Sequence, residues 1–345
     1  MFSKKSIKTF KEISLQPGVS GCEISSGITD LIFNIVKKIA PNSKIDKYGN
    51  VVSIIGHGSK EIIVDTHLDE FGFYVNKNNN VIQIKPIGSF NYKNIKNQKA
   101  EIVNKNISGK LKLMNNKNIQ FIPEKNSDLV KIYKNDLVIF KKTFQINNGL
   151  IKATSLDNRV GCFLATEIMK NLKNQLPGNL SVKFVFSAGE ESGKFLLNKV
   201  VKKDNASVII IDAAYAEPVK FINAGRDVKI PKIGDGCAIQ TRGKNFVINK
   251  NILEKIEKLA IDNKIKIQKE TPPANQGQTN LSGLKIKNKN NCVVINIPVK
   301  NQHEQISECG INDVKSAFNL IDLVIKNLAD PLSWPPQSCQ SDFVI

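Results

Sequence analysis

The stretch Ile62-Ile63-Val64-Asp65-Thr66-His67-Leu68-Asp69-Glu70 decides the fold, because an apolar run typical of a buried strand stops abruptly in polar side chains. Similar strand-like runs lie at 181–187, 207–212 and 292–297, and helical patterns lie at 158–173, 191–203, 250–263 and 312–328. Strands that alternate with helices predict an α/β fold around a mixed, largely parallel sheet. Ligands bind such a sheet at the carboxyl ends of its strands, which is where His67 lies.

The segment from residue 76 to about 150 differs in texture from the rest of the chain. Short β-like runs at 81–87, 109–114, 119–122 and 136–140 alternate with turns rich in Asn and Lys, and no helical pattern appears. We therefore predict a small all-β domain, 76–150, inserted into an α/β domain made of residues 1–75 and 151–345. The end of the chain, 331–345 with Trp334-Pro335-Pro336, is predicted to be irregular.

Composition predicts a cytoplasmic protein. The sequence has 345 residues, no apolar stretch near the ~20 residues that cross a bilayer, and a basic start without an apolar core after it. Its six cysteines form no CxxC pair, which favours reduced thiols over a disulfide framework. We expect no membrane partner.

The net charge of +19 raises the alternative of a basic nucleic-acid-binding protein. Only three of the 50 basic residues are arginines (Arg159, Arg226 and Arg242), although arginine is the usual reader of base edges and phosphates. The lysines are spread along the whole chain. We therefore expect no specific nucleic-acid partner, and the alternative rests on charge alone.

Polar residues that can bind metal follow the strand-like runs or open a helix-like one: His67, Asp157, Glu190, Glu191, Asp212 and His303. Each signal alone has an ordinary explanation, such as a hydrogen-bonded histidine, a glutamate at a helix start or an aspartate N-cap. The third histidine, His57, lies between glycines and is expected in an exposed turn. Two imidazoles and several carboxylates at one sheet edge together predict a dinuclear metal centre.

Such a centre implies metal-assisted hydrolysis. Two cations lower the pKa of a shared water and polarise a carbonyl group, while a carboxylate that is not a ligand moves the proton. In the pair Glu190-Glu191, one residue can bind metal while its neighbour faces the water. A glycosidase is less favoured, because its paired carboxylates work without companion histidines.

The chain resembles the tetrahedral (TET), glutamyl and deblocking aminopeptidases, cytosolic metallo-exopeptidases with two metals per chain. The resemblance covers nearly the whole length and rests on several segments: Pro17-Gly18-Val19-Ser20-Gly21-Cys22-Glu23 ("PGxSGxE"), Asp46-Lys47-Tyr48-Gly49-Asn50 ("DxxGN"), His67-Leu68-Asp69-Glu70-Phe71-Gly72 ("HxDExG"), Ser155-Leu156-Asp157-Asn158-Arg159 ("ALDDR") and Glu190-Glu191-Ser192-Gly193 ("EExG"). The family fold is an α/β catalytic domain interrupted by a β-rich module used in assembly.

This resemblance implies roles for the candidate residues. Asp157 would bridge two divalent metals, most commonly Zn²⁺ or Co²⁺. His67 and Asp212 would hold one metal, and Glu191 and His303 the other. Glu190 would be the general base, and Asp69 would orient His67. The implied activity is removal of N-terminal residues from short peptides by a homo-oligomer, either a dimer or a dodecamer.

Four departures from the family pattern leave a second reading open. Asn158 and Asn280 stand where the family has acids, Lys300-Asn301-Gln302-His303 replaces "RYxH", and the glutamate expected after His303 is absent or shifted by one. The inserted segment is also shorter than usual. The alternative is a degenerate relative that binds metal or peptide with little turnover.

Overall fold

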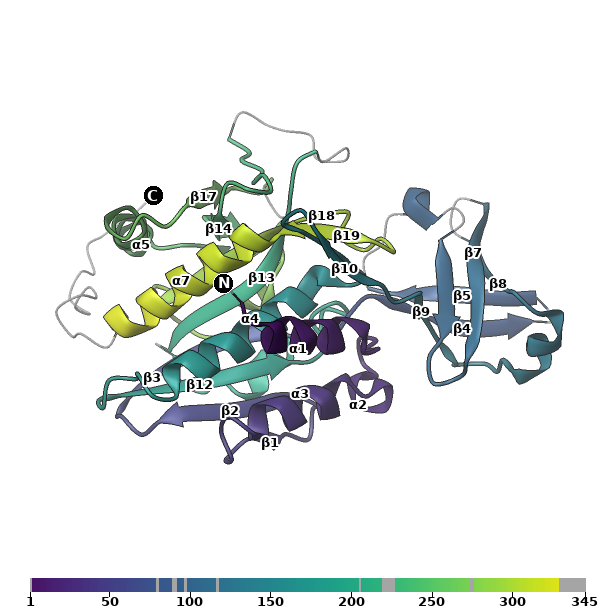
Figure 1. Ribbon diagram of the computed structural model, residues 1–345, viewed down its shortest axis with the longest axis horizontal. Helices are drawn as coiled ribbons and strands as arrows, with labels where there is room; N and C mark the ends of the chain where they lie inside the picture. The colour runs from purple at the N-terminus through teal and green to yellow at the C-terminus, as the bar shows by residue number, and fades with distance from the viewer. Residues whose placement is uncertain are drawn as a thin grey trace.

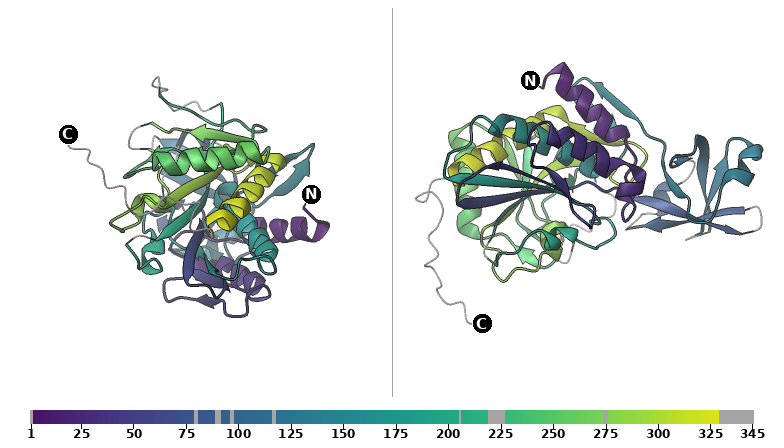
Figure 2. Two further views of the ribbon diagram at one scale, coloured as in Figure 1. Left: turned by 90° about the vertical axis from the view of Figure 1, so that its left-hand side faces the viewer. Right: turned by 90° about the horizontal axis from the view of Figure 1, so that it is seen from below.

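The protein has a large α/β body and a smaller all-β unit that projects from one side of it (Figures 1 and 2). This is a computed structural model that describes residues 2–78, 81–88, 92–95, 98–115, 118–204, 206–218, 227–273 and 276–328. The segment 331–345, predicted to be irregular, lies outside the described residues. Within these ranges, no helix is long and apolar enough to cross a membrane.

Within the described residues, eleven strands form the main sheet: β1 (Lys44–Ile45), β2 (Val51–Gly56), β3 (Lys60–His67), β10 (Phe144–Asn147), β11 (Leu150–Ala153), β12 (Leu180–Ser187), β13 (Ser207–Tyr215), β14 (Cys237–Gln240), β17 (Ile267–Glu270), β18 (Cys292–Lys300) and β19 (Ser307–Gly310). Their order is β1-β2-β12-β3-β13-β18-β19-β11-β10, with β14 between β18 and β17. The central strands β12, β3, β13 and β18 are parallel, whereas β14 is antiparallel to β18. A separate ribbon joins β15 (Arg242–Gly243) to β16 (Phe246–Val247).

The central strands are apolar throughout because both faces of the sheet are covered. Along β3, Ile62 and Val64 belong to the larger hydrophobic core, while Ile63 belongs to the core on the opposite face. Along β13, Ile209 and Ile210 divide between the two cores in the same way. Each such side chain contributes about 1.5–3 kcal/mol when fully buried. Two-sided burial therefore fixes the register that brings the strand ends to one edge.

Helices cover the sheet: α1 (Lys4–Leu15), α2 (Glu23–Ser26), α3 (Ile28–Lys37), α4 (Leu156–Leu172), α5 (Lys250–Asp262), α6 (Asn280–Gly283) and α7 (Ile311–Leu328). Helix α4 packs on β3, β13 and β18, between α1 and α7 (Figure 1). The helix predicted at 191–203 was wrong. That segment holds turns and a short 3₁₀ helix, η3 (Leu196–Lys199), because Gly189, Gly193 and Phe195 have positive φ values that interrupt a right-handed helix.

The smaller unit is a closed barrel with strand order β4-β5-β8-β7-β6-β9. Its elements are β4 (Gly72–Asn78), β5 (Val81–Ile87), η1 (Tyr92–Ile95), β6 (Lys99–Ile102), β7 (Ile107–Asn115), β8 (Asn118–Pro123), η2 (Asn126–Lys131) and β9 (Leu137–Phe140). The chain then returns to the main sheet through β10 and β11. The predicted α/β fold with an inserted all-β unit is confirmed, and the division at 75/76 and 150/151 stays a prediction.

Candidate metal centre

The parallel register brings the predicted strand ends together. Ser187 of β12 lies beside His67 of β3, so Glu190 and Glu191 follow at the same edge of the sheet. Strand β13 pairs with β3 on its other side, and its register places Asp212 level with His67. The strand predicted to end at 212 continues to Tyr215. His303 lies three residues after the end of β18. One sheet edge therefore presents side chains that are up to 236 positions apart in the chain, from His67 to His303.

Asp157 lies at the centre of the group and faces both imidazoles. Its Oδ1 is 3.1 Å from Nε2 of His67, and its Oδ2 is 3.5 Å from Nε2 of His303. The residue is at the start of α4, but its own backbone (φ −79°, ψ 106°) is not helical, so the regular helix begins after it. Each carboxylate oxygen thus serves a different histidine, which is the arrangement expected of a bridging ligand.

Two sets of three ligand atoms share Asp157. In the first set, His67 Nε2 is 3.4 Å from Asp212 Oδ1, and in the second, His303 Nε2 is 3.2 Å from Glu191 Oε2. All ligand atoms within each set lie within 4.8 Å of one another. Ligands about 2.0–2.1 Å from a tetrahedral zinc lie about 3.3 Å from each other, so both sets have the spacing of a metal site.

The chemistry of the donors also fits divalent cations. Glu191 Oε1 is buried and has no hydrogen-bond partner among the described residues, so a metal would satisfy an otherwise costly acceptor. Among the residues that the structure describes, no lysine or arginine lies within 4 Å of the carboxylates of Asp157, Glu191 or Asp212. The residues present therefore match two cations with mixed imidazole and carboxylate ligands.

Without a cation, the cluster distorts the protonation of its own members. Burial opposes charge on His67 and His303, but the surrounding carboxylates outweigh it and raise the pKa of both imidazoles well above the usual value. Burial raises the pKa of Glu191 and Asp212, and the negative charge of Asp157 adds to this shift. Bound protons therefore neutralise part of the negative charge of the cluster, and a bound cation would take over that role.

Asp69 connects the His67 strand end to the loop that carries both glutamates. Its fully buried carboxylate lies 3.5 Å from Nδ1 of His67 and accepts hydrogen bonds from the backbone N–H groups of Glu190 (3.2 Å) and Glu191 (3.0 Å). A carboxylate on the second nitrogen fixes the orientation of a ligating imidazole. Asp69 is therefore placed to hold both His67 and the Glu190-Glu191 backbone in position.

Glu190 belongs to neither ligand set but lines the same cavity. Burial raises the pKa of its carboxyl group well above the usual value. The negative charges of Asp212, Glu191 and Asp69 add to the shift, while His67 opposes it. A carboxylate that accepts protons more readily than usual, beside a metal site, suits proton transfer.

Two of the departures from the family pattern are buried hydrogen-bond donors. Asn158 donates to the backbone carbonyl of Ile211 (2.7 Å) and to the Thr66 hydroxyl (3.0 Å), which joins α4 to β13 and β3. Asn280 donates to Asp65 (2.8 Å) and to the Ser187 hydroxyl (2.7 Å) behind the metal ligands. An amide can donate these bonds and an ionised acid cannot. Both asparagines support the strand ends and belong to neither ligand set.

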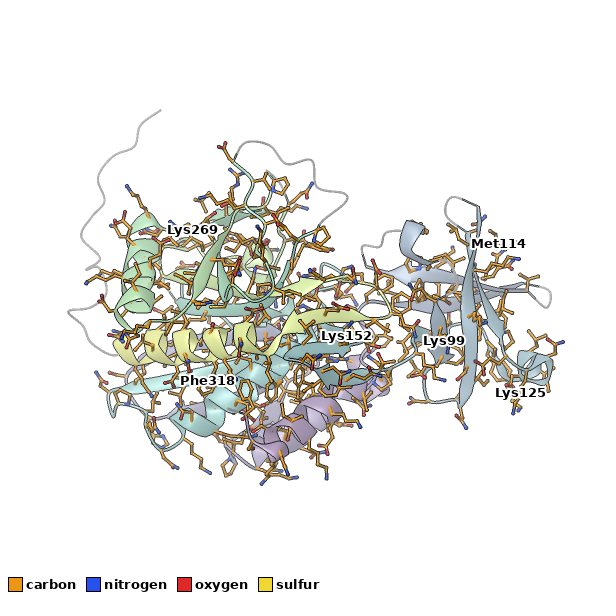
Figure 3. The ribbon with its side chains drawn as sticks, turned by 45° about the horizontal axis from the view of Figure 1, so that its top comes forward. Lys99, Met114, Lys125, Lys152, Lys269 and Phe318 are labelled. Atoms are coloured by element: carbon orange, nitrogen blue, oxygen red, sulfur yellow. The ribbon has the colours of Figure 1, made fainter. Side chains whose placement is uncertain are left out.

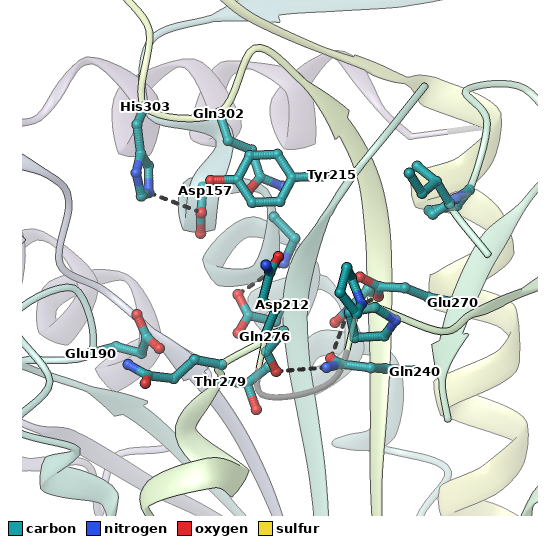
Figure 4. A pocket seen from close by; sticks show the side chains of 18 of the residues that line it. Asp157, Glu190, Asp212, Tyr215, Gln240, Glu270, Gln276, Thr279, Gln302 and His303 are labelled. Carbon is teal, nitrogen blue, oxygen red and sulfur yellow. Dashed lines mark hydrogen bonds and ion pairs between the residues drawn. The ribbon is translucent and has the colours of Figure 1, made fainter. Parts of the chain in front are cut away.

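The cluster opens into a cavity of about 200 Å³. Figure 4 shows Glu190, Asp157 and His303 on one side of the cavity and Gln240 and Glu270 on the other. Gln240, Glu270 and Asn296 also line the cavity and were not predicted from the sequence. Gln240 and Glu270 lie on β14 and β17, which run antiparallel to β18, so they could not be predicted from parallel strand ends. Asn296 lies inside β18, away from the strand end. An acid at the end of a strand, Glu270, was the only available signal.

Known proteins with similar structures share this architecture. A TET aminopeptidase from Thaumarchaeota archaeon SCGC AB-539-E09 superposes with a TM-score of 0.83 at 19% identity, over 95% of this chain and 98% of that one. The TET1 peptidase of Pyrococcus horikoshii, described as assembling into a tetrahedron or a large octahedral shell, gives a TM-score of 0.74 at 22% identity, over 93% and 99% of the two chains. At these identities the likeness shows the fold.

Sequence comparisons identify the family. A lysyl aminopeptidase of Pyrococcus furiosus is 39% identical over 80 residues, which cover 23% of this chain and 23% of that protein. The family model described as M42 glutamyl aminopeptidase matches residues 49–320, well over half of the sequence and the part that contains every candidate metal ligand. The predicted family is confirmed: the chain belongs to the M42 glutamyl aminopeptidases, which are metal-dependent hydrolases.

Proposed function

We propose that the protein is a dinuclear metallo-aminopeptidase that removes N-terminal residues from short peptides. The observation that carries the proposal is Asp157, whose two carboxylate oxygens face the two imidazoles of separate ligand sets. His67 and Asp212 would hold one divalent cation, and Glu191 and His303 the other. Zn²⁺ and Co²⁺ suit these imidazole and carboxylate ligands. When bound, such cations lower the pKa of a water and polarise the scissile carbonyl group.

The remaining chemistry belongs to the side chains of this chain. Glu190 would take the proton of the attacking water and deliver it to the leaving amine, for which its raised pKa is suited. Asp69 would keep His67 and the Glu190 backbone in position through its buried carboxylate. The cavity beside the cluster would admit the first residue of the peptide.

Homo-oligomers are also proposed. The TET1 peptidase of Pyrococcus horikoshii is described as assembling into a tetrahedron or a large octahedral shell. Its fold matches 93% of this chain. The projecting barrel, 72–140, is the part of the molecule best placed to contact a second copy (Figure 2). A dimer is the smallest assembly of this kind, and a dodecamer is the larger alternative. The cytoplasmic location stays a prediction.

The lysines give no support to a nucleic-acid-binding surface. Figure 3 labels Lys99 and Lys125 on the barrel and Lys152 and Lys269 on the α/β body, so basic residues lie over both parts of the molecule. Nucleic-acid affinity would fall steeply with salt and would not depend on Glu190. The two proposals therefore separate in one experiment.

The test is hydrolysis of aminoacyl-p-nitroanilides and short peptides by protein loaded with Zn²⁺ or Co²⁺. Glu190→Gln should lose about 10²–10⁴-fold in kcat while retaining two metals per chain, because a positioned base contributes by that factor. Glu254→Gln, an exposed glutamate on α5, is the matched control and should keep full activity. Two bound metals without cleavage would favour the degenerate relative, and absence of metal would refute the site.

A further inference from the structure

A second polar group lies in the cavity, away from the metal ligands. Asn296 on β18 is the register partner of Asp212 on β13, and Gln240 on β14 is the partner of Glu270 on β17. The Asn296 amide donates to Glu270 Oε2 (2.6 Å) and to Gln240 Oε1 (3.1 Å). Asn296 therefore connects the strand of the metal ligand Asp212 to the carboxylate of Glu270. Figure 4 shows Asp212 and Glu270 in the same cavity.

Glu270 is a buried carboxylate without a cation. It is only 8% exposed, and no lysine or arginine of the described chain lies within 4 Å of it. Its one hydrogen bond among the described side chains comes from a neutral amide. Lys229, which also lines the cavity, is exposed to solvent and forms no ion pair with Glu270. A buried carboxylate normally has a charged partner, so this one is incompletely compensated.

Two further features show that Asn296 and Glu270 lack a hydrogen-bond donor. The Asn296 Oδ1 atom is buried and has no hydrogen-bond partner among the described residues. The Gln240 amide already donates to the backbone carbonyls of Arg242 (3.0 Å) and Gly277 (2.7 Å), so it cannot turn toward Glu270. Burial raises the pKa of Glu270 to about 7, which a ligand cation would reverse.

The cavity that holds the metal cluster and Glu270 has apolar as well as polar walls. Ala213, Ile230, Pro231, Pro272 and Pro273 line the same cavity. A ligand that fills this space needs a flexible aliphatic stem with a cationic donor at its end. Lysine and arginine side chains have this form. An acidic side chain would bring a second negative charge beside Glu270 and is disfavoured.

We propose that Glu270 and Asn296 receive the side chain of the substrate's N-terminal residue and select lysine or arginine. This assignment rests on the aminopeptidase activity proposed above. Glu270 is then a specificity residue: it binds the substrate side chain and takes no part in proton transfer. A preference for basic N-terminal residues would be opposite to that of a glutamyl aminopeptidase.

The test compares lysyl-p-nitroanilide with norleucyl-p-nitroanilide, which has a similar stem but no charge. The wild type should prefer the lysyl substrate, and Glu270→Gln should lower the lysyl-to-norleucyl ratio of kcat/KM by about 10–100-fold, mainly through KM. Glu254→Gln should leave the ratio unchanged. An unaltered ratio in Glu270→Gln, or a wild type that prefers leucyl or glutamyl substrates, would overturn the assignment.

A binding measurement separates this proposal from the activity on which it rests. Calorimetric titration of metal-loaded wild type with lysinamide and norleucinamide measures the pocket without turnover. Tighter binding of lysinamide, weakened in Glu270→Gln, supports the pocket even if no substrate is cleaved, in which case only the aminopeptidase proposal fails. Equal binding of the two amides overturns the pocket while cleavage of any substrate still supports the peptidase.

Discussion

Two buried carboxylate clusters lie within a few residues of each other and differ in how their charge is balanced. In the metal-ligand cluster, the two imidazoles are the only cationic side chains of the described residues within 4 Å of Asp157, Glu191 and Asp212. In the second cluster, Glu70 is 1% exposed and contacts the buried cations Lys142 and Arg159. It also accepts hydrogen bonds from the Ser155 hydroxyl and from the Gly18 backbone N–H at 2.7 Å.

The pKa values follow this difference. Burial opposes ionisation of Glu70, but Lys142 and Arg159 outweigh it and hold its pKa below the usual value. In the metal-ligand cluster, burial instead raises the pKa of Glu191 and Asp212, whereas His303 and His67 outweigh burial at the central Asp157 and lower its pKa. A carboxylate balanced by cations of its own chain is structural, whereas a cluster left short of positive charge is built for cations from outside.

The largest effect should come from the shared ligand. Asp157→Asn removes a negative oxygen from both ligand sets, so we expect kcat/KM to fall by at least about 10³-fold and metal content to drop below two per chain. Metal analysis by mass spectrometry and p-nitroanilide assays check this. Asn158→Ala is the comparison variant, since it loses structural hydrogen bonds but no ligand. Full metal content in Asp157→Asn would contradict the bridging role.

The balanced cluster should respond in stability. Glu70→Gln leaves Lys142 and Arg159 buried without a counter-charge, so the unfolding free energy should fall by about 3–5 kcal/mol. The exposed pair Lys258–Asp262, with 3.1 Å between its charged atoms, is the control, and Asp262→Asn should cost less than about 1 kcal/mol. Urea denaturation of both variants measures the difference. Equal losses would show that Glu70 is no more than a surface ion pair.

A smaller effect should appear in the pH dependence of the metal-free protein. The raised pKa values of Glu191 and Asp212 mean that the folded state binds more protons than the unfolded chain above about pH 4. The raised pKa values of His67 and His303 act in the same direction, since their stabilisation is present below about pH 6.5 and lost as the pH rises through those values. Unfolding free energy should therefore fall as the pH rises.

We expect a loss of about 1–3 kcal/mol between pH 5 and pH 8 for protein treated with a chelator. Saturating Zn²⁺ should reduce the loss, because bound cations replace the protons. Denaturant unfolding at the two pH values with and without metal provides the measurement. Glu70 should contribute with the opposite sign, since its stabilisation is lost as the pH falls. A metal-free protein that gains stability at pH 8 would contradict the comparison.

Much of the fold could be predicted because its signals are local. The apolar runs of β3, β12, β13 and β18 are long enough to indicate buried strands, and α4 and α7 show helical periodicity. The helix predicted at 191–203 failed because its apolar spacing was read without the positive φ values of Gly193 and Phe195. This loop is also held by hydrogen bonds from the Glu190 and Glu191 backbone to Asp69, a long-range contact that the spacing of apolar residues does not show.

The candidate site divides in the same way. His67, Asp157 and Asp212 could be predicted together because parallel strands expose their carboxyl ends at one edge. Glu270 and Asn296 could not, because their contact depends on β14 and β17, two short strands that precede β18 in the chain and run antiparallel to it. The role of Glu70 could not be predicted from the sequence either. Its partner Lys142 is one of many lysines, and the whole barrel lies between the two residues in the chain.

The ring of Phe71 links the barrel to the ligands. It stacks on the imidazole of His303 with centroids 5.6 Å apart and also contacts the rings of Phe73 (4.9 Å) and Phe140 (6.2 Å) in the barrel strands. A neighbouring copy that tilts the barrel would therefore push directly on one imidazole. If copies of the chain assemble through the barrel, as proposed, contact between them would act on His303 through Phe71 without any change in the metal ligands.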